Sequence, residues 1–300
     1  MRCYHHRGER LRSKALTGEL KLVEITEDLR REVAAARAEG GRIGLVPTMG
    51  ALHEGHLSLV RAAREQCDFV VVTIFVNPAQ FGPHEDFGQY PRRLESDLAA
   101  CRELGVDLVY HPATESVYPE EFKTFVEVEE LSNMLEGAFR PGHFRGVATV
   151  VLKLFNRVCP DVAYFGRKDY QQQLLIRRMC ADFDLPISLQ ICPIVRDEDG
   201  LALSSRNSYL TPQQRRSALA LSQSLQLARD QFAKGATNVE AVRALMRAHL
   251  NETPGVELDY ATIAHPESLV EIAEPLPEMI ALVAARVDAI RLIDNMLLKT

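Results

Sequence analysis

Short apolar runs alternate with amphipathic segments between residues 43 and 195, and this alternation constrains the fold more than any other feature. Residues 69–76 are rich in β-branched types and end at Asn77 and Pro78, which is typical of a strand buried on both faces. Because parallel strands need crossover connections, usually helical, the pattern predicts a parallel sheet covered on both sides. The other strands are predicted at residues 21–25, 43–46, 106–110, 162–165 and 187–195, and the helices at residues 26–39, 55–66, 91–104, 146–158 and 171–182.

The pattern changes after Arg206. Thr211 offers a capping hydroxyl, Pro212 suits the first helical position and Gln214 completes a capping box, so a helix begins there. Helices are predicted at about residues 212–233 and 238–251, strands at residues 258–264 and 279–286, and a short final segment from residue 292.

The fold class is therefore α/β. We predict a Rossmann-like parallel sheet domain over residues 21–195 and a smaller C-terminal α+β lid domain over residues 196–300. Residues 1–20 have no periodic apolar face and are predicted to be a disordered extension.

Composition and charge exclude several classes of protein. The net charge is −6, from 41 acidic and 35 basic side chains, which argues against nucleic acid as a main partner. No apolar run approaches the roughly 20 residues that cross a bilayer, and the N-terminus has no signal-peptide pattern. The six cysteines include no CxxC pair, so we expect reduced thiols in a cytoplasmic protein with no membrane partner, disulfide or zinc site.

The most informative polar stretch, residues 46–56, lies where the first buried strand ends and a helix begins. Gly50 allows a tight turn, and Gly55 allows close approach of backbone or ligand. His53 and His56 are three residues apart, so both imidazoles face one side of a helical turn, beside amides that favour an anion. They suit a triphosphate, although a metal pair and a capping or core role remain alternatives.

Three further polar clusters follow predicted strands. Gly166 and Lys168 open a helix, where an ammonium can meet phosphate oxygens; an exposed charged turn is the alternative. The loop 203–206 offers two hydroxyls and a guanidinium, or a plain serine turn. Asn77 and Gln80 can orient a small polar substrate or belong to a solvated turn. Neither a GxxxxGK[ST] nor a GxGxxG loop is present.

Taken together, these stretches resemble one family. The chain is similar to the pantothenate synthetases (pantoate–β-alanine ligases), of the HxGH nucleotidyltransferase-like superfamily, from about residue 22 to residue 295. Arg167 departs from the family, in which glutamate or glutamine usually precedes the lysine; we expect its side chain to point away. The matching stretches are VPTMGALHEGH, FVNPAQF, YPR, MLEGAFRPGHFRGV, FGRKDYQQ, GLALSSRNSYL and RLIDN.

The resemblance implies a two-step reaction with ATP as a substrate, Mg²⁺ on the leaving pyrophosphate, and a homodimer. Pantoate and ATP would form pantoyl adenylate, and β-alanine would convert it to pantothenate and AMP. His56 would be the proton donor, Gln80 and Gln172 would bind pantoate, and Gln80 would also meet β-alanine. The catalytic supply of charge and donors would be His53, His56, Lys168, Ser204, Ser205 and Arg206. The ATP site would comprise Met49, Gly50, Ala51, Leu52, His53, Glu54, Gly55, His56, Gly166, Arg167, Lys168, Asp169, Val195, Leu203, Ser204, Ser205 and Arg206.

Two further hypotheses concern the neighbouring segments. Residues 136–146, with Arg140, His143 and Arg145, would form a mobile wall over the pantoate pocket. An apolar strand at residues 122–128 could serve as a dimer interface.

Two other functions remain alternatives to the ligase. One is an HxGH nucleotidyltransferase that stops at nucleotide transfer, making a dinucleotide or dephospho-coenzyme A. The other is a non-catalytic nucleotide-binding scaffold.

Overall fold

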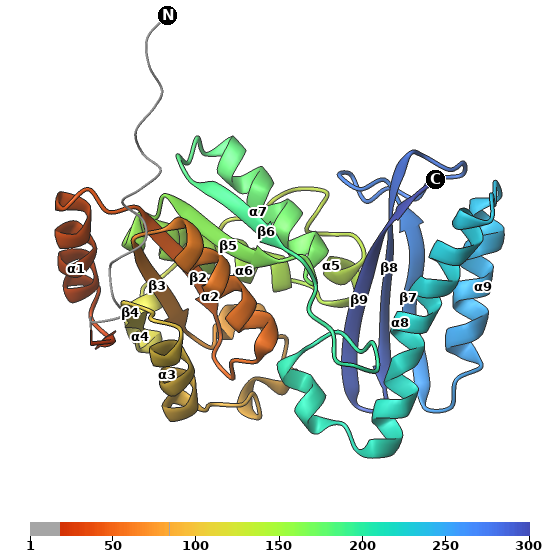
Figure 1. Ribbon diagram of the computed structural model, residues 1–300, viewed down its shortest axis with the longest axis horizontal. Helices are drawn as coiled ribbons and strands as arrows, with labels where there is room; N and C mark the ends of the chain where they lie inside the picture. The colour runs from red at the N-terminus through yellow and green to blue at the C-terminus, as the bar shows by residue number, and fades with distance from the viewer. Residues whose placement is uncertain (1–18, 84) are drawn as a thin grey trace, which may run out of the picture.

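The computed structural model describes residues 19–300 except residue 84, so the predicted extension over residues 1–20 lies outside the described residues as far as residue 18. A six-stranded parallel sheet forms the larger layer, with strand order β1-β4-β3-β2-β5-β6 (Figure 1). The predicted fold is confirmed. Its strands are β1 (Lys21–Val23), β2 (Ile43–Thr48), β3 (Phe69–Ile74), β4 (Leu108–Tyr110), β5 (Val162–Gly166) and β6 (Ser188–Cys192).

The sheet is buried on both faces, as the β-branched run in β3 predicts. Val71 packs into the core on one face, whereas Val70 and Val72 pack into the core on the other. Helices α1 (Thr26–Ala38), α6 (His143–Val158) and α7 (Tyr170–Asp182) cover the first face. Helices α2 (Glu54–Gln66) and α3 (Leu94–Glu103) cover the second. The short helices are α4 (Thr114–Val117), α5 (Glu136–Phe139) and the 3-10 turns η1 (Pro78–Gln80), η2 (Asp86–Gly88) and η3 (Ser205–Tyr209).

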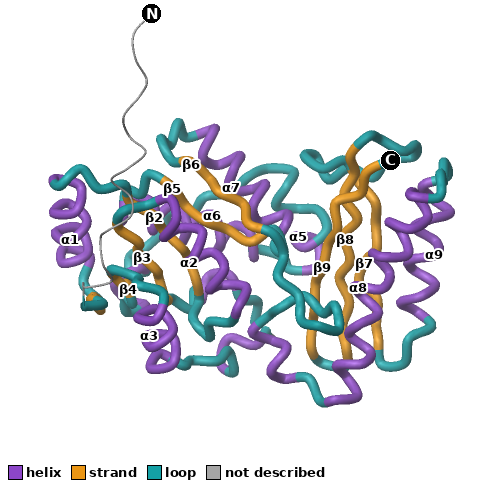
Figure 2. The backbone as a smooth tube through the Cα atoms, in the orientation of Figure 1, coloured by secondary structure: helices purple, strands orange, loops and turns teal. Residues whose placement is uncertain are grey.

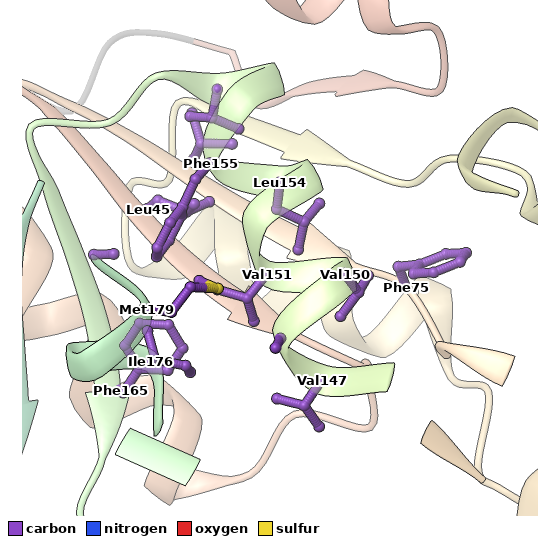
Figure 3. Close-up of a cluster of buried hydrophobic side chains, with 14 of the residues drawn as sticks. Leu45, Phe75, Val147, Val150, Val151, Leu154, Phe155, Phe165, Ile176 and Met179 are labelled. Carbon is purple, nitrogen blue, oxygen red and sulfur yellow. The ribbon is translucent and has the colours of Figure 1, made fainter. Parts of the chain in front are cut away.

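Helix α6 is the centre of the first core. Its apolar side chains meet Leu45 of β2, Phe165 of β5, and Ile176 and Met179 of α7 (Figure 3). Most residues of this helix are buried, and exposed polar residues such as Arg145 and Asn156 lie on one stripe, so the helix is amphipathic with a wide apolar face. The same helix also reaches the site described below, so the core positions one wall of it.

A second, antiparallel sheet of three strands occupies the C-terminal part, in the order β7-β8-β9. Its strands are β7 (Val256–Ala264), β8 (Glu278–Val287) and β9 (Ile290–Lys299), and helices α8 (Pro212–Ala233) and α9 (Val239–Asn251) pack on one face. The other face meets Tyr170 and Leu174 of α7, so this sheet lies between its own helices and the larger domain (Figures 1 and 2).

Several predicted details are wrong. The short segment from residue 292 is the ten-residue strand β9, and residues 122–128 form no strand. Strand β6 ends at Cys192, which leaves residues 193–195 in a loop. Thr26 does not cap α1; its hydroxyl pairs instead with the Tyr110 hydroxyl at 2.9 Å.

Candidate active site

A pocket of about 230 Å³ lies where β2, β3, β5 and β6 end, facing the loop that precedes η3. The carboxyl edge of a parallel sheet is where ligands bind in such folds. Residues that the sequence singled out, from separate parts of the chain, meet in it. Those that line it are Met49, His53, Gly55, His56, Gln80, Gly166, Lys168, Asp169, Gln172, Val195, Leu203, Ser204, Ser205 and Arg206.

Five residues of the predicted ATP site do not line this pocket. Gly50, Ala51 and Leu52 form the turn beneath it. Glu54 is exposed and pairs with Arg61 at 2.6 Å, because at the first turn of α2 it points to solvent. Arg167 lines a different cavity. Its side chain therefore points away from this pocket, as expected.

A buried carboxylate that could not be identified from the sequence holds the turn after β2. Asp97 of α3 accepts hydrogen bonds from the amides of Ala51 and Leu52, at 2.9 and 2.8 Å. Gly50 and Ala51 both have positive φ values, of 82° and 50°, in the turn that presents the amides of Ala51 and Leu52 to this carboxylate. Burial raises the Asp97 pKa, while the two amides act in the opposite direction. An isolated aspartate in a helix gives no sequence signal for this contact.

The two histidines cap α2 with their side chains. The Gly55 amide donates to Nδ1 of His53 at 3.2 Å, and the His53 amide donates to Nδ1 of His56 at 3.4 Å. Because Nδ1 accepts in both rings, the neutral imidazoles carry their proton on Nε2, which remains a donor for a ligand. A Cβ on Gly55 would lie 2.9 Å from Cε1 of His53, so glycine allows this folded-back ring. The two histidines therefore do cap α2, as one of the alternatives predicted, and they also line the pocket.

Both imidazoles are uncharged at neutral pH in the protein without ligand. Burial, and then the positive charge of Lys168, lowers the pKa of His53 to about 4. Burial, with His53 and Lys168 next, lowers the pKa of His56 to about 3. The histidines thus supply hydrogen-bond donors, and positive charge comes from Lys168 and Arg206. The sequence analysis assigned positive charge and hydrogen-bond donation to these residues as one group, whereas here the two roles belong to different residues.

Lys168 and Arg206 face the pocket from two sides. The Lys168 ammonium lies 3.8 Å from the Asp169 carboxylate. Arg206 follows Ser204, whose hydroxyl caps η3 by accepting from the Arg206 amide at 3.3 Å. Ser205 donates to the Ala51 carbonyl at 3.3 Å, which ties the loop before α8 to the turn after β2. The turn after β2 and the loop before α8 are therefore in direct contact.

Gln80 is held at the other end of the pocket by Asn77. The Asn77 amide donates to Oε1 of Gln80 at 3.0 Å and to the Gly146 carbonyl at 3.2 Å. Asn77 is 1% exposed, so it positions Gln80 and does not line a solvated turn. Gln172 lines the pocket from the first turn of α7.

Within residues 136–146, two of the three singled-out side chains reach the pocket. Arg140 and His143 line it, and His143 Nδ1 lies 2.9 Å from the Gln80 carbonyl oxygen. Arg145 is exposed and stacks over the Phe125 ring at 3.8 Å, so it is not a pocket residue. Burial lowers the pKa of His143 to about 4.

Neither a metal cluster nor a membrane helix occurs in the described part of the chain. Among residues 19–83 and 85–300, no group of three or more His, Cys, Asp or Glu side chains is arranged to hold a metal ion. In the same residues no helix is both long and apolar enough to cross a membrane.

Comparison with known proteins agrees with the geometry. Residues 21–297 match the sequence profile of the family described as pantoate-beta-alanine ligase. A pantothenate synthetase from Moorella thermoacetica is 51% identical over 280 residues, which cover 93% of this chain and 99% of that protein. A crystal structure of pantothenate synthetase from Thermus thermophilus is 47% identical, with a TM-score of 0.88 over 92% of this chain and 98% of that one. The Francisella tularensis pantoate-beta-alanine ligase, complexed with beta-gamma ATP and beta-alanine, is 34% identical, with a TM-score of 0.78 over 93% and 98%.

Proposed function

The chain belongs to the pantoate–β-alanine ligase family, and from this premise we propose that the pocket at the carboxyl edge of the larger sheet is its active site. The reaction is the ATP-dependent condensation of (R)-pantoate with β-alanine. The pantoate carboxylate attacks the α-phosphorus of ATP, which gives pantoyl adenylate and pyrophosphate. The β-alanine amine then attacks the acyl carbon, which gives pantothenate and AMP.

One observation carries the assignment: donors and cations from three distant loops line a single pocket. A carboxylate and a triphosphate repel each other, so the first step needs fixed donors and positive charge where negative charge accumulates. Lys168 and Arg206 supply the charge, and Ser204 supplies a hydroxyl donor. Ser205 would supply a second donor once its hydroxyl leaves the Ala51 carbonyl. The Nε2–H groups of His53 and His56 complete the set as neutral donors.

The nucleotide is proposed to lie between the turn after β2 and the loop before η3. Residues 166–169 would face the phosphates, with the Lys168 ammonium on their oxygens. The Val195 carbonyl accepts from the Leu203 amide at 3.0 Å, while no residue in the described part of the chain bonds the Val195 amide. That amide would meet the adenine edge. His56, the proposed proton donor, would donate from Nε2.

Pantoate is proposed to lie between Gln80 and Gln172. Its carboxylate and hydroxyl groups need polar partners, and its two methyl groups need an apolar surface. The pocket offers both, because Val147, Val150 and Val151 of α6 line it together with the two glutamines. β-Alanine would enter against Gln80, near the Arg140 guanidinium.

Residues 136–146 are proposed to close over pantoate and keep water from the adenylate. Arg140 pairs with Glu85 at 2.5 Å, which ties this wall to the segment after η1. Hydrogen exchange at residues 136–146 should slow when ATP and pantoate are both present. Equal protection with and without the two substrates would contradict the closing role.

Mg²⁺ is proposed to arrive with the nucleotide. Magnesium usually takes one or two carboxylates and several phosphate oxygens or waters. Asp169 is the pocket carboxylate that fits, because its side chain is half exposed, whereas Asp86 is engaged by Arg206. When bound there, the ion would neutralise charge on the leaving pyrophosphate.

We infer a nucleotide- and pantoate-binding domain over residues 21–195 and a lid domain over residues 196–300. A homodimer would use the extended segment 122–128, and sedimentation would test it. A cytoplasmic location would suit the free thiols of the five described cysteines, and cell fractionation would test it.

The activity is tested by withholding the amine. With ATP, Mg²⁺ and pantoate alone, mass spectrometry should find pantoyl adenylate, and AMP release should require β-alanine. Lys168→Ala and His56→Ala should each depress adenylate formation by about 100-fold or more. Lys168→Ala should leave the urea midpoint nearly unchanged, whereas His56→Ala also removes a helix-capping contact and should lower the midpoint. Unchanged turnover in both variants would refute the assigned site.

A further inference from the structure

Strand β9 carries two consecutive buried polar residues, and both reach out of their own sheet. Asp294 is 4% exposed and Asn295 is 2% exposed. Neither contributes to the apolar core of the C-terminal sheet, and each bonds a segment that lies near the phosphate-directed side of the pocket. Buried polar residues in a strand interior are costly unless they are fully hydrogen-bonded.

Asn295 clamps the lysine turn. Its side-chain amide nitrogen donates to the carbonyl oxygen of Arg167 at 3.0 Å and of Lys168 at 2.8 Å. On the other side of the turn, the Arg167 amide donates to the Cys192 carbonyl of β6 at 2.9 Å. The backbone from which the Lys168 side chain extends is therefore held between one strand of each sheet.

Asp294 holds the loop that leads into residues 203–206 to the same strand, β9. Its carboxylate accepts from both terminal nitrogens of Arg196, at 2.6 and 2.9 Å. Arg196 also donates to the Gly200 carbonyl at 3.1 Å, across the tight loop that leads into residues 203–206. The backbone amide of Asn295 donates to the Asp294 carboxylate at 2.7 Å, so the two clamps are joined.

The carboxamide of Asn295 is not fully satisfied. Its Oδ1 is buried and has no hydrogen-bond partner among the described residues. An unpaired buried acceptor costs about 1–3 kcal/mol. Stability alone therefore does not account for asparagine here, whereas its two donated hydrogen bonds act directly on the lysine turn.

We propose that Asn295 is a positioning residue for adenylate formation, which fixes the Lys168 turn relative to the loop 203–206 from the C-terminal sheet. It does not touch substrate; it acts through Lys168. The inference rests on the proposed function of that lysine. A displacement of about 1 Å at a reacting group can cost about 100-fold in rate, so a clamp of this kind has a measurable effect.

The test is a double-mutant cycle on the first half-reaction. Pantoate-dependent exchange of pyrophosphate with ATP is measured for the wild type, Asn295→Ala, Lys168→Ala and the double variant. We expect Asn295→Ala to lower the exchange kcat at least about 10-fold in the wild type and less than about 2-fold in the Lys168→Ala background. Equal losses in the two backgrounds would overturn the proposal.

A second readout separates positioning from folding. Aminolysis of supplied pantoyl adenylate by β-alanine involves no pyrophosphate, so Asn295→Ala should change it less than about 3-fold. An equal loss in both half-reactions would indicate a merely structural role. Thr262→Val is the matched control, since Thr262 is also buried in this sheet and its hydroxyl bonds only Glu271 among the described residues. It should leave the exchange rate unchanged, and urea midpoints are recorded for all variants.

The exchange rates of the single variants distinguish a failure of the proposed function from a failure of the positioning role. If Lys168→Ala exchanges pyrophosphate normally, the proposed function of the pocket fails. If Lys168→Ala is impaired and Asn295→Ala exchanges normally, only the positioning role fails.

Discussion

Arg206 donates two parallel hydrogen bonds to the Asp86 carboxylate, from Nε at 2.9 Å and from Nη2 at 2.7 Å. Arg206 belongs to the loop before α8, whereas Asp86 belongs to η2 on the N-terminal side of the pocket. The ion pair therefore joins the two halves of the chain beside the proposed triphosphate site. It orients the guanidinium plane, and it also offsets part of the positive charge that a nucleotide would meet.

Asp86→Asn should tighten ATP binding and slow the chemistry. Removing the carboxylate frees the Arg206 charge, so the KM for ATP should fall about 3-fold, while kcat should fall because the guanidinium is no longer held in its plane. Steady-state kinetics at two ionic strengths measure both changes. Asp28→Asn, which removes the partner of Arg31 on α1, is the control and should change neither constant. A rise in the KM for ATP would contradict the prediction.

The buried histidines should make the protein without ligand less stable in acid. Folding lowers the pKa of His53 to about 4 and of His56 to about 3, from 6.5 in the unfolded chain. At pH values between the folded and unfolded pKa, the unfolded state binds more protons than the folded state. The free energy of unfolding therefore rises with pH up to about 6.5, and this stabilising contribution is lost as the pH falls below 6.5. One such histidine contributes at most about 1.4 kcal/mol per pH unit. Urea titrations from pH 7 to about 4.5 should show a shallower slope for His56→Gln than for the wild type. Identical slopes would count against a neutral His56.

Local sequence patterns predicted the larger sheet and the loops at its edge. A buried strand such as β3 needs β-branched residues throughout, so it is visible in the sequence without knowledge of its neighbours. The clusters around His53 and Lys168 were found because each follows such a strand. Their convergence follows from the parallel arrangement, in which all carboxyl ends share one edge.

Contacts with residues far away in the chain could not be predicted from the sequence. Strand β9 was missed because Asp294 and Asn295 interrupt its apolar pattern, and its strand character comes from pairing with β8. The hydroxyl of Thr26 reads as a helix cap but pairs with Tyr110, 84 positions away. The neutral state of the histidines likewise depends on burial, which no local spacing encodes.

Breaking the buried ion pair between Glu136 and Arg291 should destabilise the protein strongly. The two side chains are 8% and 15% exposed and join α5 to β9, with Tyr260 donating to the same carboxylate at 2.8 Å. Glu136→Ala leaves a buried guanidinium with Asp259 as its remaining carboxylate partner, so the free energy of unfolding should fall by about 3 kcal/mol. Urea denaturation measures this, and Glu32→Gln, in a more exposed pair with Lys21, should cost less than about 1 kcal/mol. A similar loss in the free energy of unfolding for the two variants would contradict this prediction.

Gly146→Ala should damage both folding and pantoate binding. A Cβ at this position would lie 2.1 Å from the Ala79 carbonyl oxygen and 2.7 Å from the Gln80 amide nitrogen, and backbone atoms cannot move aside cheaply. Helix α6 must then separate from η1, which displaces Gln80 and stretches the hydrogen bond from Asn77 to the Gly146 carbonyl. We expect Tm to fall by roughly 5 °C and the KM for pantoate to rise about 10-fold. Gly88→Ala is the control, because a Cβ there meets nothing within 4 Å. If Tm falls and the KM for pantoate is unchanged, contact between α6 and η1 does not hold Gln80 in place.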